Sequence, residues 1–324
     1  MGLSTGRDLH VDSLLSQIAI NYRPEGMIAD QIAPIVSVAK ETDGYPVFNR
    51  GEAFAIENTA RSRTTEANRV TRSVSTAAYQ VKNYALAYDT PIEDRANIDA
   101  AYAFELEAGA VRYLNDKLML DWDRRVLTAA RTGVSTTFLA GSSWTSLTNQ
   151  GDAFSQIIQA KEQIKAATAK TGNSILLGWR AYQWMRRNTA MRNLINGTNN
   201  GQGILTRQQM QDVFEVDRFL VADAFYNPAN EAQTATFSNY FPADAVMVYY
   251  APMTANRETP SFMYSFRWTA PELGVPMAAI RHPFETRTKV DGIEVGYYQD
   301  EKITGSEYGV ILTGVGSAQA TGLV

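Results

Sequence analysis

The residue types that carry most enzyme chemistry are scarce in this sequence. It contains no cysteine and two histidines, His10 and His282. Catalysis by a Ser-His-Asp arrangement requires a histidine that a carboxylate orients and that contacts an exposed serine. His10 lies in the N-terminal segment and His282 stands directly before Pro283, so we interpret both as surface or structural residues. No catalytic residue is predicted.

Metal and cofactor sites also lack their usual signatures. Without cysteine, and with two distant histidines, a transition-metal centre would consist mostly of carboxylates. The acidic groups Asp121/Asp123 and Asp300-Glu301 lack the spacing of a calcium loop and have basic neighbours, which favours salt bridges or a solvated surface. The glycines between residues 197 and 203 match neither a Walker A motif nor a dinucleotide fingerprint. We predict no metal and no cofactor.

The charged residues that do form a pattern lie in one polar tract. Residues 50–72 hold five arginines and three glutamates, separated mostly by small or polar residues. A strand is predicted at Tyr45–Phe48 before the tract, and alternating apolar residues predict another after it. A phase shift near Lys82-Asn83 predicts a β-bulge in the second strand. An isolated two-stranded ribbon is marginal in water, so the tract is either a disordered surface insertion or is held by another molecule. The strand pattern on both sides favours the second interpretation.

The flanking segments predict an extended piece and a long helix. Residues 1–20 have apolar residues near helical spacing, and three glycine or proline residues between 24 and 34 predict an extended segment. Thr90-Pro91-Ile92-Glu93 resembles a capping box, and Asp99 is a second candidate cap. Apolar residues then recur every three or four positions until Gly133. A helix of about 32 residues would be roughly 48 Å long.

The second half of the chain predicts a mixture of helices and strands. A helix capped by Asp152 and ended by Gly172 comes first, and Asp291-Gly292 later has the composition of a two-residue hairpin turn. The remaining predicted strands are 175–177, 219–221, 245–250, 286–290, 293–297 and 308–312, and the remaining predicted helices are 180–187 and 206–213.

Composition sets broad limits. The chain has 324 residues, of which 45% are hydrophobic and 20% charged, as in an ordinary globular protein. Thirty basic residues against 34 acidic ones give a net charge of -4, which does not suit a protein that binds a nucleic-acid backbone by bulk charge. No secretory signal or membrane helix is predicted, and the lack of cysteine fits a reducing compartment.

In their order along the chain, these segments resemble the major capsid proteins of tailed bacteriophages. The residues that carry the resemblance are Tyr22-Arg-Pro-Glu-Gly-Met-Ile-Ala-Asp-Gln-Ile-Ala-Pro34, the ribbon, Thr90-Pro-Ile-Glu-Asp-Arg-Ala-Asn97, Asn173-Ser-Ile-Leu-Leu-Gly178 and Phe214-Glu-Val-Asp217. The resemblance implies an α+β protein of the Hong-Kong-97-like fold. Its expected parts are an N-terminal arm (1–44), an extension loop (45–88), a peripheral domain with a long spine helix (89–173), an axial α/β domain (174–275) and C-terminal strands that return to the peripheral domain (276–324).

The resemblance also implies a function. The chain would form hexamers and pentamers of an icosahedral shell in the virion, assembled in the bacterial cytoplasm around DNA that it does not read. Scaffolding, portal and decoration proteins would be partners, with no membrane. The arm and the extension loop would lie along neighbouring subunits. The residues expected to make intersubunit contacts are Glu52, Glu57, Arg61, Arg63, Arg69 and Arg72.

Two features depart from some family members. Only about 40 residues precede the extension loop, which leaves no room for a long built-in scaffolding segment. The tip from Arg50 to Arg72 contains no lysine, so the lysine–asparagine cross-link of some members is not expected here.

Three other functions stay open at this point. An encapsulin would enclose a cargo enzyme in a shell of the same fold. A hydrolase would use a serine, His282 and a carboxylate. A tail or adhesion component would form tubes or spikes.

Overall fold

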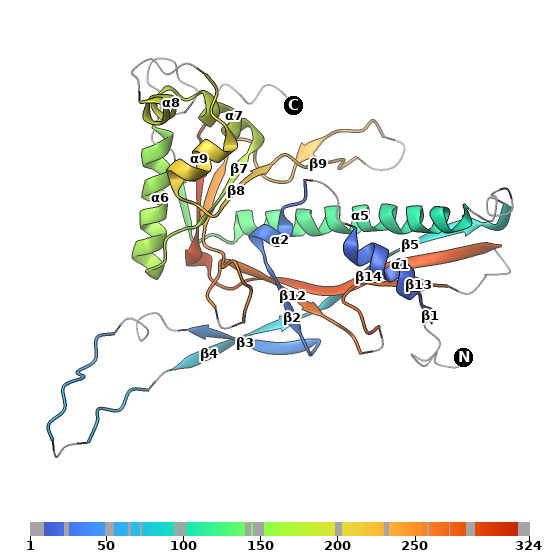
Figure 1. Ribbon diagram of the computed structural model, residues 1–324, viewed down its shortest axis with the longest axis horizontal. Helices are drawn as coiled ribbons and strands as arrows, with labels where there is room; N and C mark the ends of the chain where they lie inside the picture. Colours follow the sequence, from blue (N-terminus) through green and yellow to red (C-terminus); the bar gives the residue numbers. More distant parts are fainter. Residues whose placement is uncertain are drawn as a thin grey trace.

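The structure is a computed structural model and describes residues 10–22, 26–48, 55–63, 66–71, 73–93, 97, 102–139, 144, 152–197, 203–229, 233–257, 259–271, 273–282 and 289–316. A long helix lies along a long sheet, and an upright α/β lobe stands at one end of them (Figure 1). A two-stranded ribbon leaves the body at the same end and points away from the lobe. The fold is therefore α+β and strongly elongated.

The long sheet has six strands centred on β14 (Val290–Ile303). One side of β14 pairs with β5 (Lys82–Pro91), and the other side pairs first with β13 and then with β12, all antiparallel. The outer strand β2 is parallel to β12. The other strands of this sheet are β1 (His10–Val11), β13 (Ala278–Arg281), β12 (Met263–Trp268) and β2 (Ile35–Val38).

The long helix α5 (Ala103–Thr132) confirms the predicted spine helix. Gly133 caps its C-terminus as predicted, and its buried face includes Val111, Leu118 and Val126. Two short helices of the N-terminal segment, α1 (Ser13–Asn21) and α2 (Ala29–Ile32), pack against it. The segment predicted as an arm, residues 1–44, thus lies on its own subunit from His10 onward.

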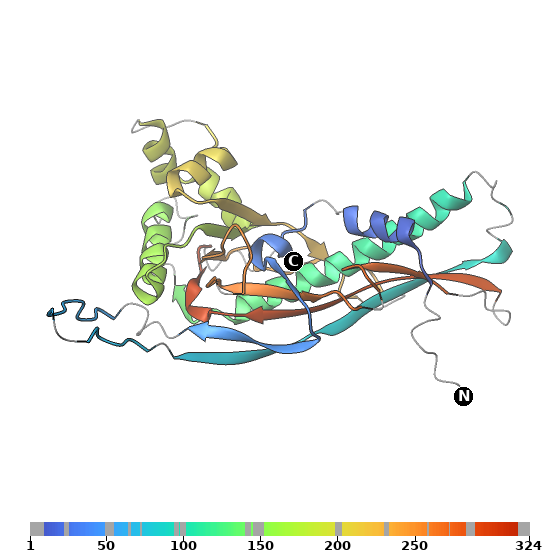
Figure 2. The same cartoon turned by 60° about the horizontal axis from the view of Figure 1, so that its bottom comes forward.

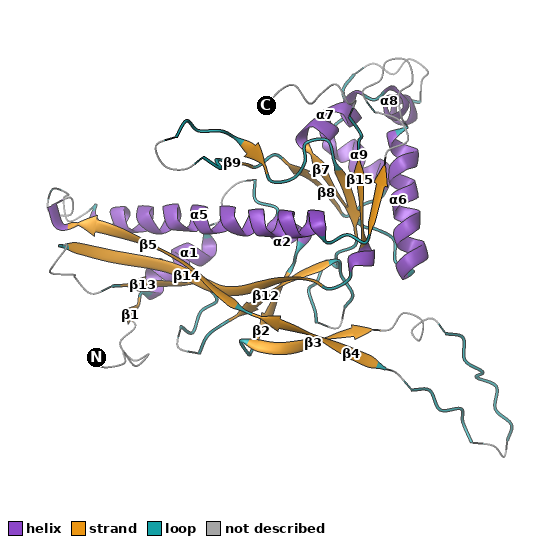
Figure 3. Ribbon diagram, turned by 180° about the vertical axis from the view of Figure 1, so that it is seen from behind, coloured by secondary structure: helices purple, strands orange, loops and turns teal. Residues whose placement is uncertain are grey.

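The upright lobe is built on a five-stranded sheet in the order β6-β15-β11-β7-β8. Helices α6, α7, α8 and α9 surround it, and a small hairpin projects from the end of β8 (Figures 1 and 3). The elements are β6 (Thr136–Leu139), α6 (Ala153–Thr168), β7 (Ser174–Gly178), α7 (Trp179–Arg187), α8 (Thr189–Asn196), α9 (Arg207–Phe214), β8 (Arg218–Ala222), the hairpin strands β9 (Phe225–Tyr226) and β10 (Ser238–Asn239), β11 (Val246–Tyr249), the 3-10 turn η2 (Ser306–Tyr308) and β15 (Gly309–Thr313).

One hydrophobic core joins the lobe to the spine helix. Trp122 and Leu127 of α5 pack in the same buried cluster as Leu176 and Met247 of the lobe and Phe262 beside the long sheet. Burial of large apolar side chains is the main favourable contribution to folding, so this shared core holds the two parts together.

The predicted hairpin at Asp291-Gly292 is wrong, because β14 runs straight through both residues. Each is paired with β5, Asp291 with Thr90 and Gly292 with Asp89. A Cβ atom on Gly292 would lie 3.1 Å from the Asp89 carboxylate and 3.3 Å from the His282 side chain. The glycine therefore permits a close approach of neighbouring side chains and does not form a turn.

Two predicted helix boundaries are displaced. Thr90 and Pro91 are the last residues of β5, where they pair with β14, and the chain becomes helical at Ile92 and Glu93, one residue later than predicted; Asp99 lies outside the described residues. Helix α6 begins after Asp152 as predicted but ends at Thr168, not at Gly172. The hydroxyl of Thr168 donates to the Ile164 carbonyl (2.7 Å), and Ala169 adopts the left-handed conformation that ends the helix.

The two sheets divide the chain differently from the predicted domains. Strand β12 falls within residues 174–275 but belongs to the long sheet, and β15 falls within residues 276–324 but lies inside the lobe sheet. Pairing of β15 with β11 and β6 buries Val310 and Leu312 in the lobe core. Pairing between strands that lie far apart in the sequence decides which sheet β12 and β15 join, and the local sequence pattern does not encode this pairing.

Two glycines offer a matched test of this packing. A Cβ atom on Gly178, between β7 and α7, would lie 2.2 Å from the Pro242 carbonyl oxygen, whereas one on Gly109, exposed in α5, meets nothing within 4 Å. We expect Gly178→Ala to lower the free energy of unfolding by about 1–3 kcal/mol through overpacking. Gly109→Ala should raise it by about 0.5–1 kcal/mol through helix propensity. Denaturant unfolding measures both, and equal effects would contradict the packing of the β7–α7 junction.

Candidate subunit interface

The ribbon extends away from its own subunit. Its root is a two-stranded antiparallel sheet of β3 (Thr42–Phe48) and β4 (Val74–Gln80). Beyond the root, the described residues between 55 and 71 have no regular secondary structure and are exposed throughout. Figures 1 and 2 show this part clear of the body in both views. Ile56 is 100% exposed and Val70 is 67% exposed, so apolar side chains of the tip are not buried in their own chain.

Four of the six predicted contact residues are described and lie on this tip. Glu57, Arg61, Arg63 and Arg69 are all exposed. Arg69 forms an ion pair with Glu66 at 3.6 Å, in which both side chains are nearly nine-tenths exposed. Such a pair adds little stability, so the tip has charged groups available to a neighbour. Glu52 and Arg72 lie outside the described residues.

An aromatic cluster attaches the root to the long sheet. The rings of Tyr45 from β3 and Tyr79 from β4 stack on Phe266 of β12, with centroids 5.3 and 4.7 Å apart. Val36 and Val38 of β2 lie in the same buried cluster. The second strand thus has a core, which its partners on distant parts of the chain provide.

Polar contacts surround this aromatic cluster. Asp300 of β14 accepts a hydrogen bond from the Gln80 amide at 2.9 Å, and the Tyr79 hydroxyl donates to the Lys40 carbonyl at 3.3 Å. Arg257 binds Asp43 at 3.4 Å and also donates to the Gly44 carbonyl. The hydrogen bond from the Gly44 amide is the main cause that lowers the pKa of Asp43. Both strands are therefore fixed to the body at their inner ends.

The direction of the ribbon changes at Val81. Strand β4 pairs with β3 as far as Gln80, and β5 pairs with β14 from Lys82 onward. Between them the buried Val81 donates its amide hydrogen to the Glu41 carbonyl at 3.0 Å. The phase shift predicted as a bulge is thus the point at which the chain passes from one sheet to another.

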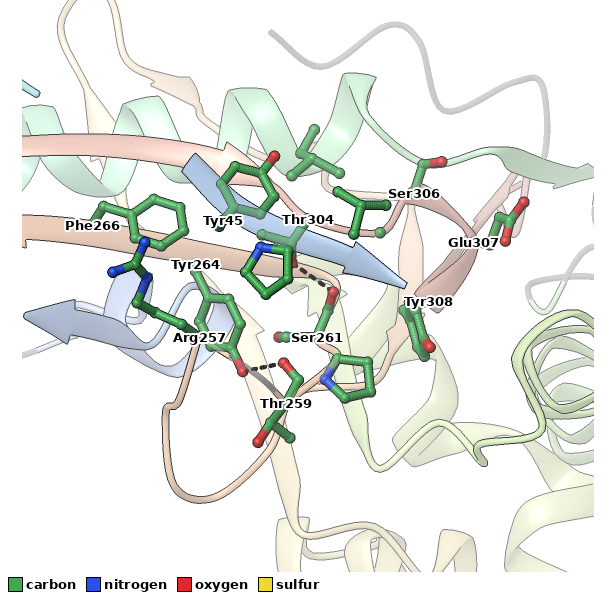
Figure 4. Close-up of a pocket in the computed structure, with 15 residues that line it drawn as sticks. Tyr45, Arg257, Thr259, Ser261, Tyr264, Phe266, Thr304, Ser306, Glu307 and Tyr308 are labelled. Atoms are coloured by element: carbon green, nitrogen blue, oxygen red, sulfur yellow. Dashed lines mark hydrogen bonds between the residues drawn. The ribbon is translucent and has the colours of Figure 1, made fainter. Parts of the chain in front are cut away.

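A groove lies beside the ribbon root. It has a volume of about 530 Å³ and lies between β3, residues 259–266 and residues 303–308 (Figure 4). The Tyr264 hydroxyl donates to the Thr259 carbonyl at 2.9 Å, and the Thr304 hydroxyl donates to the Ser261 carbonyl at 2.8 Å. These bonds hold the wall of the groove in place next to the ribbon.

A second exposed surface, the flank patch, lies between α5 and the outer strand β5. It consists of Leu86 and Tyr88 of β5 and Tyr113 of α5, which are 40–53% exposed. The Tyr88 and Tyr113 rings meet edge to face, with centroids 6.4 Å apart. Exposed apolar groups next to an unpaired strand edge are typical of protein–protein contacts.

The spine helix is fixed to the sheet by a charged network. Arg125 of α5 lies 3.6 Å from the centroid of the Tyr84 ring and forms an ion pair with Glu301 of β14 at 3.0 Å. Burial favours the neutral guanidine, but the hydrogen bonds and charges of Glu301 and Tyr297 outweigh it and raise the pKa of Arg125. The network keeps the flank patch and the ribbon root on one rigid support.

A buried carboxylate holds the N-terminal segment on the spine helix. Asp123 of α5 is fully buried and accepts hydrogen bonds from the amides of Ile28 (3.1 Å) and Ala29 (2.8 Å) at the start of α2. Among the described residues, its second oxygen has no hydrogen-bond partner. Burial, the largest cause, raises the pKa of Asp123 to about 6, the nearby charge of Asp30 adds to this shift, and the two amides oppose it.

Among the described residues, no serine lines the pocket at His282 and no cluster of metal ligands is present. His282 lies 2.8 Å from Glu294, but the residues that line the adjacent pocket include no serine. Within the part of the chain that the structure describes, no three His, Asp or Glu side chains converge as a metal site. Among the same residues, none of the helices has the length and apolar composition needed to cross a membrane.

Comparisons with known proteins show which sequences this chain resembles. No family model matches the sequence. The chain is 24% identical over 278 residues to the major capsid protein of Burkholderia phage BcepMu, covering 84% of this chain and 86% of that protein. It is 25% identical over 260 residues to the major capsid protein of Pseudomonas phage JBD67, covering 80% and 83%.

Solved structures show the same fold. A phage-related protein from Bordetella bronchiseptica RB50 matches with a TM-score of 0.72 at 20% identity, covering 95% of this chain and 98% of that one. The capsid of cyanophage P-SCSP1u matches with a TM-score of 0.55 at 11% identity, covering 91% and 90%. The fold is thus the Hong-Kong-97-like fold of phage capsid proteins, as predicted. By sequence, the chain is a homologue of phage major capsid proteins.

The aromatic attachment of the ribbon root can be tested by mutation. Tyr79→Ala removes the ring that stacks on Phe266 and should lower the free energy of unfolding by about 3–5 kcal/mol. Hydrogen exchange of the β3 amides should accelerate more than that of the β7 amides. Ile56→Ala, at a fully exposed position of the same ribbon, is the control and should change neither measurement. Equal exchange rates in wild type and Tyr79→Ala would contradict the attachment.

Asp123 generates a prediction about pH. Because its folded-state pKa is raised from 3.8 to about 6, the group stabilises the protein below pH ~4, and this contribution is lost as the pH rises through 6. At ~1.4 kcal/mol per pKa unit, the loss amounts to no more than about 3 kcal/mol. Asp123→Asn should therefore gain stability relative to the wild type when the pH is raised from 4.5 to 7. Denaturant unfolding at both pH values tests this, and an unchanged difference would exclude the shift.

Proposed function

We propose that this chain is the major capsid protein of a tailed phage and assembles as hexamers and pentamers into a closed shell around the genome. The projecting ribbon carries this proposal, because its root is firmly attached and its exposed tip is not covered by its own subunit. An exposed ribbon of this kind gains order only by contact with another molecule. The sequence relationship to phage major capsid proteins supports a second copy of the chain as that molecule.

The ribbon and the flank patch suit opposite sides of one contact. The tip offers Ile56, Val70 and the ribbon arginines, and the flank patch offers exposed aromatic side chains beside an unpaired strand edge. Asp116 lies on α5, one of the two elements that form the patch, and can pair with an arginine. A contact between two different surfaces repeats from copy to copy and closes into a ring when the rotation permits.

Many weak contacts make such a shell stable. Exposed ion pairs contribute only about 0.2–1 kcal/mol each. A subunit held at several places gains avidity, because each contact raises the effective concentration of the others. The proposed functional parts are the extension loop (45–88), the peripheral region around α5 and the long sheet, and the axial lobe. Scaffolding, portal and decoration proteins are the proposed partners, and the host cytoplasm is the proposed place of assembly.

An encapsulin-type compartment is the alternative that the fold permits. The phage relatives favour the capsid over it. A nuclease-protected genome inside the purified particles would support the capsid, and an enclosed enzyme would support the encapsulin.

Charge reversal of the ribbon tests the proposal. Replacing Arg61, Arg63 and Arg69 by Glu should abolish shells under the electron microscope, because like charges then meet at the contact with the neighbour. Thermal unfolding of the unassembled subunit should stay within about 0.5 kcal/mol of wild type, since these side chains are exposed. Lys170→Glu, an exposed reversal after α6, is the control and should assemble normally. Normal shells from the triple variant would refute the role of these arginines.

A further inference from the structure

The charges of the upright lobe are strongly segregated along the chain. Residues 174–211 carry five arginines and no aspartate, glutamate or lysine. Residues 212–256 carry six carboxylates and one basic residue, Arg218. The two segments thus have net charges of +5 and -5. We call the arginines Arg180, Arg186, Arg187, Arg192 and Arg207 the basic set, and the carboxylates Asp212, Glu215, Asp217, Asp223, Glu231 and Asp244 the acidic set.

The two sets meet on α9 and otherwise lie on different elements. The basic set lies on α7 and α8 and at the first residue of α9. The described members of the acidic set lie from the end of α9 to the segment before β11. Helices α7, α8 and α9 gather at the free end of the lobe, away from the spine helix (Figures 1 and 3). The lobe therefore presents both charge signs far from the ribbon.

Within the subunit, arginines of the basic set bind neutral groups. Arg186 donates to the Leu205 carbonyl (3.0 Å) and Arg187 to the Gln183 carbonyl (3.2 Å). Arg192 donates to the Thr189 hydroxyl at 3.3 Å. These bonds orient the guanidinium groups without neutralising their charge, so the positive charge of this surface is not compensated by these contacts.

Carboxylates of the acidic set are likewise held by neutral donors. Asp212 accepts a hydrogen bond from the side-chain amide of Gln208 at 2.8 Å, and Asp217 accepts one from the side-chain amide of Asn173 at 2.9 Å. Both carboxylates and Glu215 are exposed. Ion pairs of other parts of the molecule lie at the ribbon, the spine helix and the long sheet.

We propose that the basic set of one subunit binds the acidic set of the next copy around a ring of lobes. The partner is a second copy of this chain because its lobe carries the opposite charge in equal amount. Since the two sets consist of different residues, the contact is head-to-tail, which generates rings when the rotation closes. The inference rests on the proposed function and adds to the ribbon a second contact, which is electrostatic and selects the correct neighbour.

A contact of this kind depends on salt. Exposed charges are screened beyond about 8 Å at physiological ionic strength, so the contact acts when two lobes come close. It accelerates association more than it strengthens the final complex, and steering of this kind raises rates by about 10- to 1,000-fold at low salt. Loss of the contact should therefore appear first as slow and weakly salt-dependent ring formation.

Complementary reversals test the proposal. One variant carries Arg187→Glu and Arg192→Glu, and a second carries Asp212→Arg and Glu215→Arg. Each variant alone should form rings at least ~10-fold more slowly than wild type at low salt. An equal mixture of the two should recover most of the rate, because every junction between unlike variants pairs opposite charges. The control carries Glu162→Lys and Lys165→Glu on the exposed side of α6, and should behave as wild type. Native mass spectrometry or mass photometry follows the oligomers.

The outcomes separate this inference from the proposed function. Wild-type protein that forms no shells under any condition would overturn the proposed function. Shell-forming wild type with reversal variants of unchanged rate and salt dependence would overturn only the inference. Failure of the mixture to exceed both single variants would also overturn it. Should a reversal variant unfold, the neutral pair Arg187→Gln and Arg192→Gln replaces it and must reduce the salt dependence of wild-type assembly.

Discussion

The structure depends on one constraint, which is that a two-stranded ribbon cannot bury enough apolar surface to stabilise itself. The chain meets it differently at the two ends of the ribbon. At the root, Tyr45 and Tyr79 stack on Phe266 and gain a core from the long sheet. At the tip, Ile56 stays fully exposed, and the missing surface must come from another molecule. A rigid root and an uncovered tip together favour assembly over a solitary existence.

The rest of the subunit works as a support for that ribbon. The spine helix lies along the sheet that holds the root, and the ion pair of Arg125 with Glu301 joins helix to sheet. The shared core around Trp122 extends the same rigid body into the lobe. An arrangement in which ribbon, flank patch and lobe keep fixed relative positions lets each contact raise the effective concentration of the others. Weak single contacts then suffice for a stable shell.

In the proposed assembly, the lobe and the ribbon recognise their neighbours by different interactions. The ribbon combines apolar side chains with arginines on an extended segment, whereas the lobe presents two surfaces of opposite charge on packed helices and strands. Apolar burial stabilises a formed contact, and long-range charge governs which surfaces meet and how fast. The carboxylate of Asp123 makes the stability of the subunit depend on pH. It holds α2 against the spine helix, and its burial disfavours the ionised form.

Local sequence patterns determined the elements whose signals are local. The spine helix and its end at Gly133, the Asp152 cap and the polar tract of the ribbon were all predictable, because periodicity, caps and composition act within a few residues. Tertiary structure decided the rest. Thr90-Pro91 became strand and Asp291-Gly292 stayed unturned because β5 and β14 pair across some 200 residues, and β15 joined the lobe through β11. The partners of the ribbon root, Phe266, Asp300 and Arg257, lie equally far along the chain, so no local pattern could reveal them.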